Sequence, residues 1–270
     1  MTKQRLLQDY ASWLKAKPFV RGGLAGGVAG AVPHSLAAIE RAIKAGLGVV
    51  LEAQLTFDGD AVVFGEARLD RLTDLSGEVG QYSSAQLQAQ KLKGTNEPLR
   101  SLSCLLPEIA GRTPVLIDAC NAPKDPLPLC FAIRRALEGY GGPIGILARH
   151  PRIIGWFGEH SRRVARGLVI SDRPEWSSWR TRSSLWRNHA IRRTHPDFAV
   201  FDVASLPSVL ATRLRQQGKP VLAWPVRTEE DRVAAIDHAD NIIQEPDLAV
   251  ATAQPKARPQ ASRPAAAARS

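Results

Sequence analysis

The chain has 270 residues, of which 44% are apolar and 23% are charged, which is ordinary for a globular protein with a buried core. This composition excludes collagen, coiled-coil and wholly disordered chains, and no run reaches the roughly 18 apolar residues of a membrane-spanning helix. Three scattered cysteines and a polar amino terminus argue against a disulfide framework, a zinc site and a signal peptide. We therefore expect a soluble cytoplasmic protein with reduced thiols.

The net charge of +10 is unevenly distributed along the chain. Residues 149–193 hold eleven arginines against three acids, and residues 251–270 hold four basic residues and no acid. The rest of the chain is close to neutral. Ala, Pro, Arg, Ser and Gln dominate residues 251–270, so we predict a disordered basic tail after a folded region of residues 1–250.

Short apolar runs rich in β-branched residues alternate with stretches of helical periodicity over most of the chain. Strands are predicted at residues 18–21, 48–55, 61–64, 114–119, 144–148, 167–170, 198–203, 221–226 and 241–244. This alternation favours a parallel sheet, either a closed (β/α)₈ barrel or an open doubly wound sheet.

Two of the intervening helices are predicted from their ends and faces. One begins near Leu36, where the apolar residues recur at helical spacing. The other lies within residues 227–239, with Thr228 as N-cap and acids in the first turn. In this second helix we expect Val233 and Ile236 to face the core.

Five glycines follow the first predicted strand: Gly22, Gly23, Gly26, Gly27 and Gly30. Backbone N–H groups in such a loop, with the amino terminus of the next helix, can cradle a phosphate. The alternative is a flexible loop between a strand and a helix. A proline after the glycines and the lack of an acid ending the next strand argue against a dinucleotide fingerprint, and favour the flexible loop.

Several segments resemble the glycerophosphodiester phosphodiesterase family. They are residues 35–43, 51–59 and 62–73, followed by 221–228 and 239–245, which match the family's last two strands. Members of that family are (β/α)₈ barrels that hydrolyse the diesters of deacylated phospholipids. The resemblance covers about residues 13–247 and implies the closed barrel, an α/β fold, rather than the open sheet.

The family's catalytic motifs are altered in this chain. Its Ala-His-Arg-Gly motif corresponds to Phe19-Val20-Arg21-Gly22, and its Phe-His-Asp motif to Phe64-Gly65-Glu66. The two family histidines therefore fall on Val20 and Gly65, neither of which can transfer a proton. Arg21 and Gly22 are unchanged, and the resemblance implies that they contact a phosphate-bearing ligand.

The family's metal and phosphate ligands are altered as well. In its Glu-Leu-Asp pair the glutamate position is Val50 and the aspartate position is Glu52. In its Glu-Ile-Lys motif the glutamate is Asp118 and the phosphate-binding lysine is Cys120. If Glu52, Glu66 and Asp118 converge at the barrel mouth, the resemblance implies a weak site for Mg²⁺ or Ca²⁺.

Two histidines are candidate substitutes for the missing pair. His34 precedes the helix after the first strand and His150 follows the strand at 144–148, so both are expected near the barrel mouth. The alternative is that each is a loop histidine bonded to water or backbone. We therefore expect a catalytically degenerate family member that binds a phosphate-bearing ligand or a phospholipid head group. The rival hypothesis is an active metal-dependent phosphodiester hydrolase with relocated groups.

Residues 173–193 are rich in tryptophan and arginine. A helical insertion from about residue 174 would place Trp176, Trp179 and Trp186 in one stripe with arginines on both sides. Such a stripe is typical of helices that contact anionic membrane, which gives a third hypothesis: a scaffold at the inner membrane surface or on an acidic partner. The alternatives are a helix packed on the barrel and a nucleic-acid patch, which no base-reading motif supports.

Overall fold

The structure is a computed structural model that describes residues 3–26, 31–119, 121–172 and 183–247. Within these residues eight parallel strands form a barrel: β1 (Phe19–Arg21), β2 (Gly48–Leu55), β4 (Val115–Asp118), β5 (Ile144–Ala148), β6 (Ala165–Ile170), β7 (Phe198–Asp202), β8 (Val221–Val226) and β9 (Asn241–Gln244). β1 pairs with both β2 and β9, which closes the circle. The predicted (β/α)₈ barrel is confirmed, and the open sheet is not formed.

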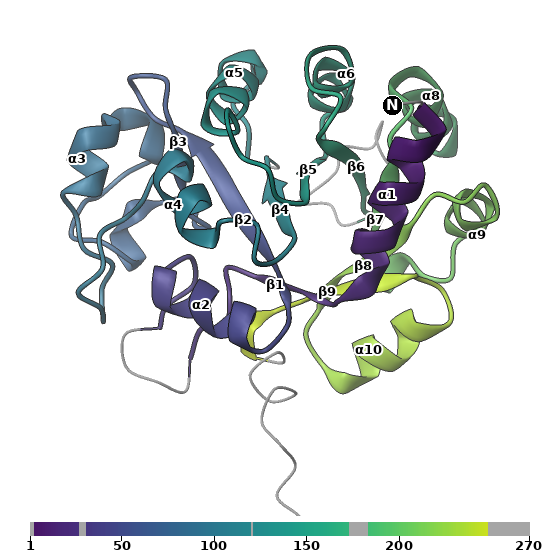
Figure 1. Cartoon of the computed structure of the whole chain (residues 1–270), viewed down its shortest axis with the longest axis horizontal. Coiled ribbons are helices and arrows are strands. Elements are labelled where there is room, and N and C mark those ends of the chain that lie inside the picture. The colour runs from purple at the N-terminus through teal and green to yellow at the C-terminus, as the bar shows by residue number, and fades with distance from the viewer. Residues whose placement is uncertain (1–2, 27–30, 120, 173–182, 248–270) are drawn as a thin grey trace, which may run out of the picture.

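Helices surround the barrel, and Figure 1 shows them in chain order around the strands. They are α2 (Leu36–Lys44), α4 (Leu102–Ile109), α5 (Leu127–Ala136), α6 (Pro151–His160), α8 (Ser184–Thr194), α9 (Val209–Gln216) and α10 (Glu229–Ile236). A further helix, α1 (Lys3–Ala16), lies across the amino-terminal end of the barrel. Its Tyr10 and Leu14 pack against Phe19 and Ile243 from the barrel interior.

The predicted strands agree with the observed ones to within a few residues at each end. The barrel strands are buried on both faces, because side chains alternate between the barrel interior and the layer beneath the helices. Such strands are near-continuous apolar runs, which is why they stand out in the sequence. The predicted strand at 61–64 is β3 (Ala61–Val63), which pairs antiparallel with β2 outside the closed circle.

The chain between β3 and α4 forms a small lobe on the side of the barrel. It contains two 3₁₀ turns, Leu69–Arg71 and Val79–Gln81, and helix α3 (Ser84–Gln88). A separate apolar cluster fills the lobe, with Phe64 among its fully buried members. The antiparallel pairing of β3 with β2 returns the chain to the barrel mouth directly after Phe64, whose N–H donates to the carbonyl of Glu52 over 2.9 Å.

Helix α10 confirms one expectation and overturns another. Its N-cap is Thr228, whose hydroxyl accepts from the N–H of Asp231. The prediction that Val233 and Ile236 face the core is wrong, because they are 60% and 59% exposed and Ala235 is buried instead. At 100° per residue Ala235 lies well away from both, so the helix packs through its small residue and leaves the larger ones in solvent.

The Arg/Trp-rich segment is described only in part. Trp186, in α8, is half-buried and packs against the main core cluster, as the packed-helix alternative predicts for this residue. Trp176 and Trp179, the predicted helix start near residue 174 and the predicted tail at 251–270 lie outside the described residues. Among the helices that are described, none has the length and apolar character needed to cross a membrane.

Asn241 of β9 is hydrogen-bonded to the end of α1 and to the residues just before β1. Its replacement is expected to destabilise the fold. Its side-chain amide donates to the carbonyls of Leu14 and Lys17 over 2.7 and 2.6 Å. Asn241→Ala leaves both carbonyls without this donor, so we expect a loss of about 1–3 kcal/mol in the free energy of unfolding. Urea denaturation measures it, with Ala at the exposed Gln217 as the control. Equal stability of the two variants would contradict this role.

Candidate functional site

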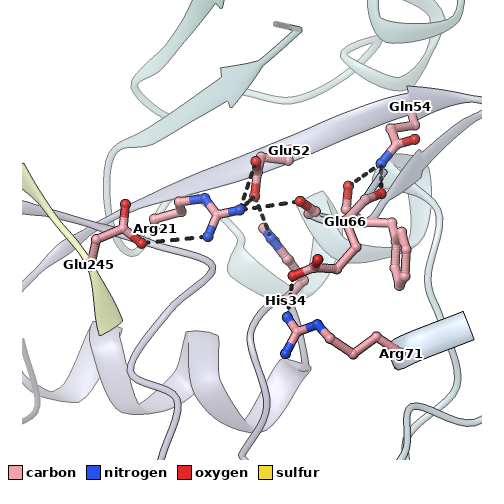
Figure 2. Close-up of polar contacts among 9 residues, drawn as sticks. Arg21, His34, Glu52, Gln54, Glu66, Arg71 and Glu245 are labelled. Carbon is pink, nitrogen blue, oxygen red and sulfur yellow. Dashed lines mark hydrogen bonds and ion pairs between the residues drawn. The ribbon is translucent and has the colours of Figure 1, made fainter. Parts of the chain in front are cut away.

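Charged side chains gather at the carboxyl-terminal end of the barrel. Arg21 ends β1, Glu52 lies in β2 opposite Asp118 of β4, Asp202 ends β7, and Glu245 follows β9. This is the end at which (β/α)₈ barrels carry their functional sites. Figure 2 shows Arg21 at the centre of the group, with Glu245 on one side and Glu52 on the other.

Arg21 is bound on both sides by carboxylates. Its Nη2 lies 3.0 and 2.8 Å from the two carboxylate oxygens of Glu52 and donates to the carbonyl of Gly65 over 3.2 Å. Its Nη1 lies 3.5 Å from an oxygen of Glu245. Burial opposes the charge of the guanidinium, but Glu52 and Glu245 outweigh it and raise the pKa of Arg21 above its ordinary value.

His34 is the second partner of Glu52. Its Nε2 lies 3.0 Å from Oε2 of Glu52, and its side chain is only 3% exposed. Because the carboxylate can only accept, Nε2 carries the proton and donates it in this bond. In the part of the chain that the structure describes, Nδ1 of the same ring is buried without a hydrogen-bond partner. His34 thus reaches the barrel mouth, but as a buried group that holds Glu52.

The imidazole of His34 occupies the space that a side chain at position 65 would fill. An ideal Cβ built on Gly65 would lie 2.5 Å from Nε2 of His34 and still closer to Oε2 of Glu52. Contacts this short are not tolerated in packed interiors. The bond between His34 and Glu52, as arranged here, therefore requires glycine at position 65, where the resemblance places a histidine.

Backbone geometry brings His34 and Gly65 to the same place. Gly22 and His34 both have positive φ, 66° and 69°, and the N–H of His34 donates to the carbonyl of Gly22 over 2.7 Å. On the other side the amide of Gln54 donates to the carbonyls of Phe64 and Glu66 over 2.7 and 2.8 Å. The first contact closes the loop after β1, and the second holds the return of the small lobe to β2, so His34 and Gly65 are each fixed beside Glu52.

The amino terminus of α2 is already occupied by a carboxylate. The N–H groups of Leu36 and Ala37 donate to the two oxygens of Glu97 over 2.6 and 2.9 Å. Anions bind at helix amino termini through these unpaired N–H groups, and Glu97 takes that place here. Of the predicted glycine loop, the structure describes Gly22, Gly23 and Gly26.

The three acids predicted as metal ligands have different partners. Glu52 binds Arg21 and His34, the carboxylate of Glu66 forms an ion pair with Arg71, and Asp118 adds to the negative field around Arg21. Among the described residues, no three His, Cys, Asp or Glu side chains are grouped as a metal site would require. The donors present therefore do not fit the divalent cation that the resemblance implies, since a cation at Glu52 would have to displace Arg21.

The remaining predicted positions lie away from this group. Val20 faces the outer layer and packs with Ile39 of α2, whereas Val50 lies inside the barrel, one layer below Glu52. His150 is the N-cap of α6, and its Nδ1 accepts from the N–H of Arg152 over 3.2 Å. Cys120 lies outside the described residues.

Sequence reasoning did not identify three residues that shape this site. They are Gln54, Glu97 and Glu245. Glu245 directly follows the last predicted strand, and that position is the one signal that could have pointed to the barrel mouth. Gln54 and Glu97 act on backbone groups far along the chain, for which their own surroundings in the sequence carry no signal.

Gly65→Ala is expected to break the bond between His34 and Glu52. The added methyl group would clash with both side chains, so we expect a loss of about 1–3 kcal/mol in the free energy of unfolding. In a His34→Ala background the same change should cost less, because one of the two clashing side chains is gone and Glu52 can shift into the space it leaves. Urea denaturation of the four proteins measures the coupling. Gly141→Ala is the control, since nothing lies within 4 Å of the added atom there; additive losses would contradict the steric conflict.

The pairing of Glu52 also predicts an acid-dependent loss of stability. Burial alone would raise the pKa of Glu52, but His34 and Arg21 together hold it below its ordinary value of 4.5. The stabilisation is complete above about pH 4.5 and is lost as the pH falls towards the folded pKa, because the unfolded chain takes up the proton first.

Glu52→Gln should therefore flatten the decline in the free energy of unfolding below about pH 4.5, by about 1.4 kcal/mol for each unit of pKa difference. Denaturation at a series of pH values measures it, with Glu230→Gln on the exposed face of α10 as the control. If Glu52→Gln and the unaltered protein decline in parallel, Glu52 does not carry this dependence.

Comparison with known proteins supports the barrel fold over most of the chain and the family resemblance over part of it. Residues 26–121 match the model of the Glycerophosphoryl diester phosphodiesterase family. None of the curated proteins that were compared matches the chain. A phosphodiesterase from Oleispira antarctica is similar in structure, with 16% identity, 90% of this chain and 98% of that chain covered, and a TM-score of 0.75.

Two further solved structures have a similar fold. A glycerophosphodiester phosphodiesterase from Thermotoga maritima has 16% identity, 87% and 98% coverage and a TM-score of 0.67. Another from Agrobacterium tumefaciens has 16% identity, 85% and 96% coverage and a TM-score of 0.62. At this level of identity the solved structures support only a shared fold. The segment that matches the family model contains His34, Glu52 and Gly65. Residues 26–121 thus resemble the glycerophosphoryl diester phosphodiesterase family, and the barrel has the fold of these solved structures.

Proposed function

We propose that this protein binds a phosphodiester at the mouth of its barrel and does not hydrolyse it. The observation that carries the proposal is the bond between His34 and Glu52 in the space of the missing side chain at position 65. That bond closes the place where the family has a histidine and engages the carboxylate that the resemblance assigns to a metal.

No histidine of the described residues is placed at the mouth for cleavage. Val20 packs in the outer layer, and Gly65 has no side chain. His34 is buried and committed to Glu52, and His150 caps a helix. Cleavage of a phosphodiester needs an acid for the leaving alkoxide and a positioned nucleophile, and each positioned proton transfer contributes about 10²–10⁴-fold. Binding without turnover is therefore favoured over an active hydrolase with relocated groups.

Arg21 supports a phosphate-bearing ligand. The Oleispira antarctica relative was solved in complex with its product, sn-glycerol-3-phosphate. In this chain the Nη2 of Arg21 is bonded to Glu52 and Gly65, and its Nη1 lies at the longer distance of 3.5 Å from Glu245. A guanidinium has five N–H donors, so Nε and Nη1 keep donors for phosphate oxygens.

The charge of the mouth favours a diester over a monoester. Four acids lie at or directly after the ends of the barrel strands (Glu52, Asp118, Asp202 and Glu245), against three arginines (Arg21, Arg149 and Arg227), and the donors of the described residues fit no divalent cation that would offset the excess. A phosphodiester carries one negative charge, whereas a phosphomonoester carries nearly two at neutral pH and is repelled more strongly. A zwitterionic glycerophosphodiester such as glycerophosphocholine is the ligand of this kind that we propose.

Purified protein should bind glycerophosphocholine and leave it intact. We expect isothermal titration to show that glycerophosphocholine binds more tightly than sn-glycerol-3-phosphate. Arg21→Lys should weaken the binding of glycerophosphocholine about tenfold, because lysine keeps the charge but lacks the planar guanidinium. Arg232→Lys on the exposed face of α10 is the control. Choline release with Mg²⁺ or Ca²⁺ should stay at background.

Two results would contradict this function. Turnover of glycerophosphocholine that Glu52→Gln or Asp118→Asn abolishes would identify a working hydrolase. Equal affinities for the diester and the monoester, unchanged in Arg21→Lys, would remove the mouth as the binding site.

A further inference from the structure

A cavity lies outside the group around Arg21. Its volume is about 960 Å³, and it lies between α6 and α8, beside the carboxyl-terminal ends of β4 and β5. These two helices are neighbours on the barrel surface, as Figure 1 shows. The cavity is of the size that small-molecule sites have, and its lining includes none of Arg21, His34 and Glu52.

The charged lining of this cavity is mainly basic. Arg149, Arg152 and Arg193 line it, and Glu159 is the one acid among the lining residues. Arg152 has an exposed carboxylate partner, Asp125, at 3.8 Å, a distance and exposure at which an ion pair contributes little. The cavity therefore carries a net positive charge, in contrast to the acid-rich mouth.

The lining includes side chains with planar rings. Trp156 and Trp186 contribute indoles, and His189 contributes an imidazole. Trp156 is held in place by His160, stacked at 4.4 Å, and by the edge-on ring of Phe131 at 5.0 Å. Rigid indoles beside arginines favour a ligand that combines a flat ring with an anion, since rings stack and guanidinium groups grip phosphate oxygens.

We infer that this cavity is a second binding site, for a small phosphomonoester that carries an aromatic ring. Its phosphate lies against Arg149, Arg152 and Arg193, and its ring lies against Trp186 and the small exposed part of Trp156, which is 8% exposed. The charge of the site explains why a monoester suits it and a diester suits the mouth. This inference does not depend on the function proposed for the mouth, because the two sites share no residue.

Isothermal titration with three probes measures the contributions of the phosphate and of the ring separately. The probes are 1-naphthyl phosphate, inorganic phosphate and 1-naphthol. We expect 1-naphthyl phosphate to bind about tenfold or more tightly than either of the others, because only it presents both ring and phosphate. If 1-naphthol binds equally well, the arginines contribute nothing. If inorganic phosphate binds equally well, the ring contributes nothing, and either result overturns the site as stated.

Neighbouring arginines of α8 give a matched pair of variants. Arg193 lines the cavity, whereas Arg192 is exposed and does not. Arg193→Glu should weaken 1-naphthyl phosphate about tenfold or more, and Arg192→Glu should change it by less than about twofold, although both alter the net charge equally. Equal weakening by the two variants would indicate attraction to the general surface charge and would overturn the site.

To distinguish the mouth from the cavity, the variant of each site is tested with the ligand of the other site. Arg21→Lys should leave the affinity for 1-naphthyl phosphate unchanged, and Arg193→Glu should leave that for glycerophosphocholine unchanged. Thermal unfolding of each variant confirms that it is folded. No detectable binding of 1-naphthyl phosphate to the unaltered protein would overturn the cavity site and leave the mouth unaffected.

Discussion

The bond between Glu52 and His34 is the constraint on which the barrel mouth depends. A buried carboxylate is costly unless it is paired and hydrogen-bonded, and Glu52 meets this condition only with Arg21 and His34 together. Arg21 in turn is held between Glu52 and Glu245, so three strands, β1, β2 and β9, are joined at their ends through one guanidinium. Glycine at position 65 follows from this arrangement, since any side chain there would meet both partners of the bond.

The imidazole of His34 lies where the first carbon of a side chain at position 65 would be. In the family the resemblance puts a histidine at position 65, on the return of the small lobe; here the imidazole comes from His34, on the loop after β1. An imidazole that comes from position 34 has a different role from one that comes from position 65. His34 is buried and points at a carboxylate, so it supports the charge of Glu52 and has no exposed nitrogen with which to meet a leaving group.

The sequence predicts the barrel well because its strands are buried on both faces and so differ from the amphipathic helices between them. It predicts single helix faces less well: Val233 and Ile236 are apolar, yet α10 packs through Ala235, since a short helix can rest on one small residue. The positions of Arg21 and Glu52 at the mouth follow from the resemblance. The bond between Glu52 and His34 does not, because it depends on positive φ at Gly22 and His34, which their sequence does not specify.

Charge is distributed around the carboxyl-terminal end of the barrel in two opposite environments. Some arginines of the basic segment are structural: Arg166 bonds Asp197 through backbone and side chain, and Arg187 pairs with Asp172. Others line the cavity between α6 and α8, while acids predominate at the mouth itself. A barrel that relied on a divalent cation would concentrate positive charge at its centre. In this chain the cation-binding donors are engaged with protein groups, and the positive charge lies in side chains at the rim. This separation of charge is the basis on which we propose a singly charged diester for the mouth and a phosphomonoester for the cavity.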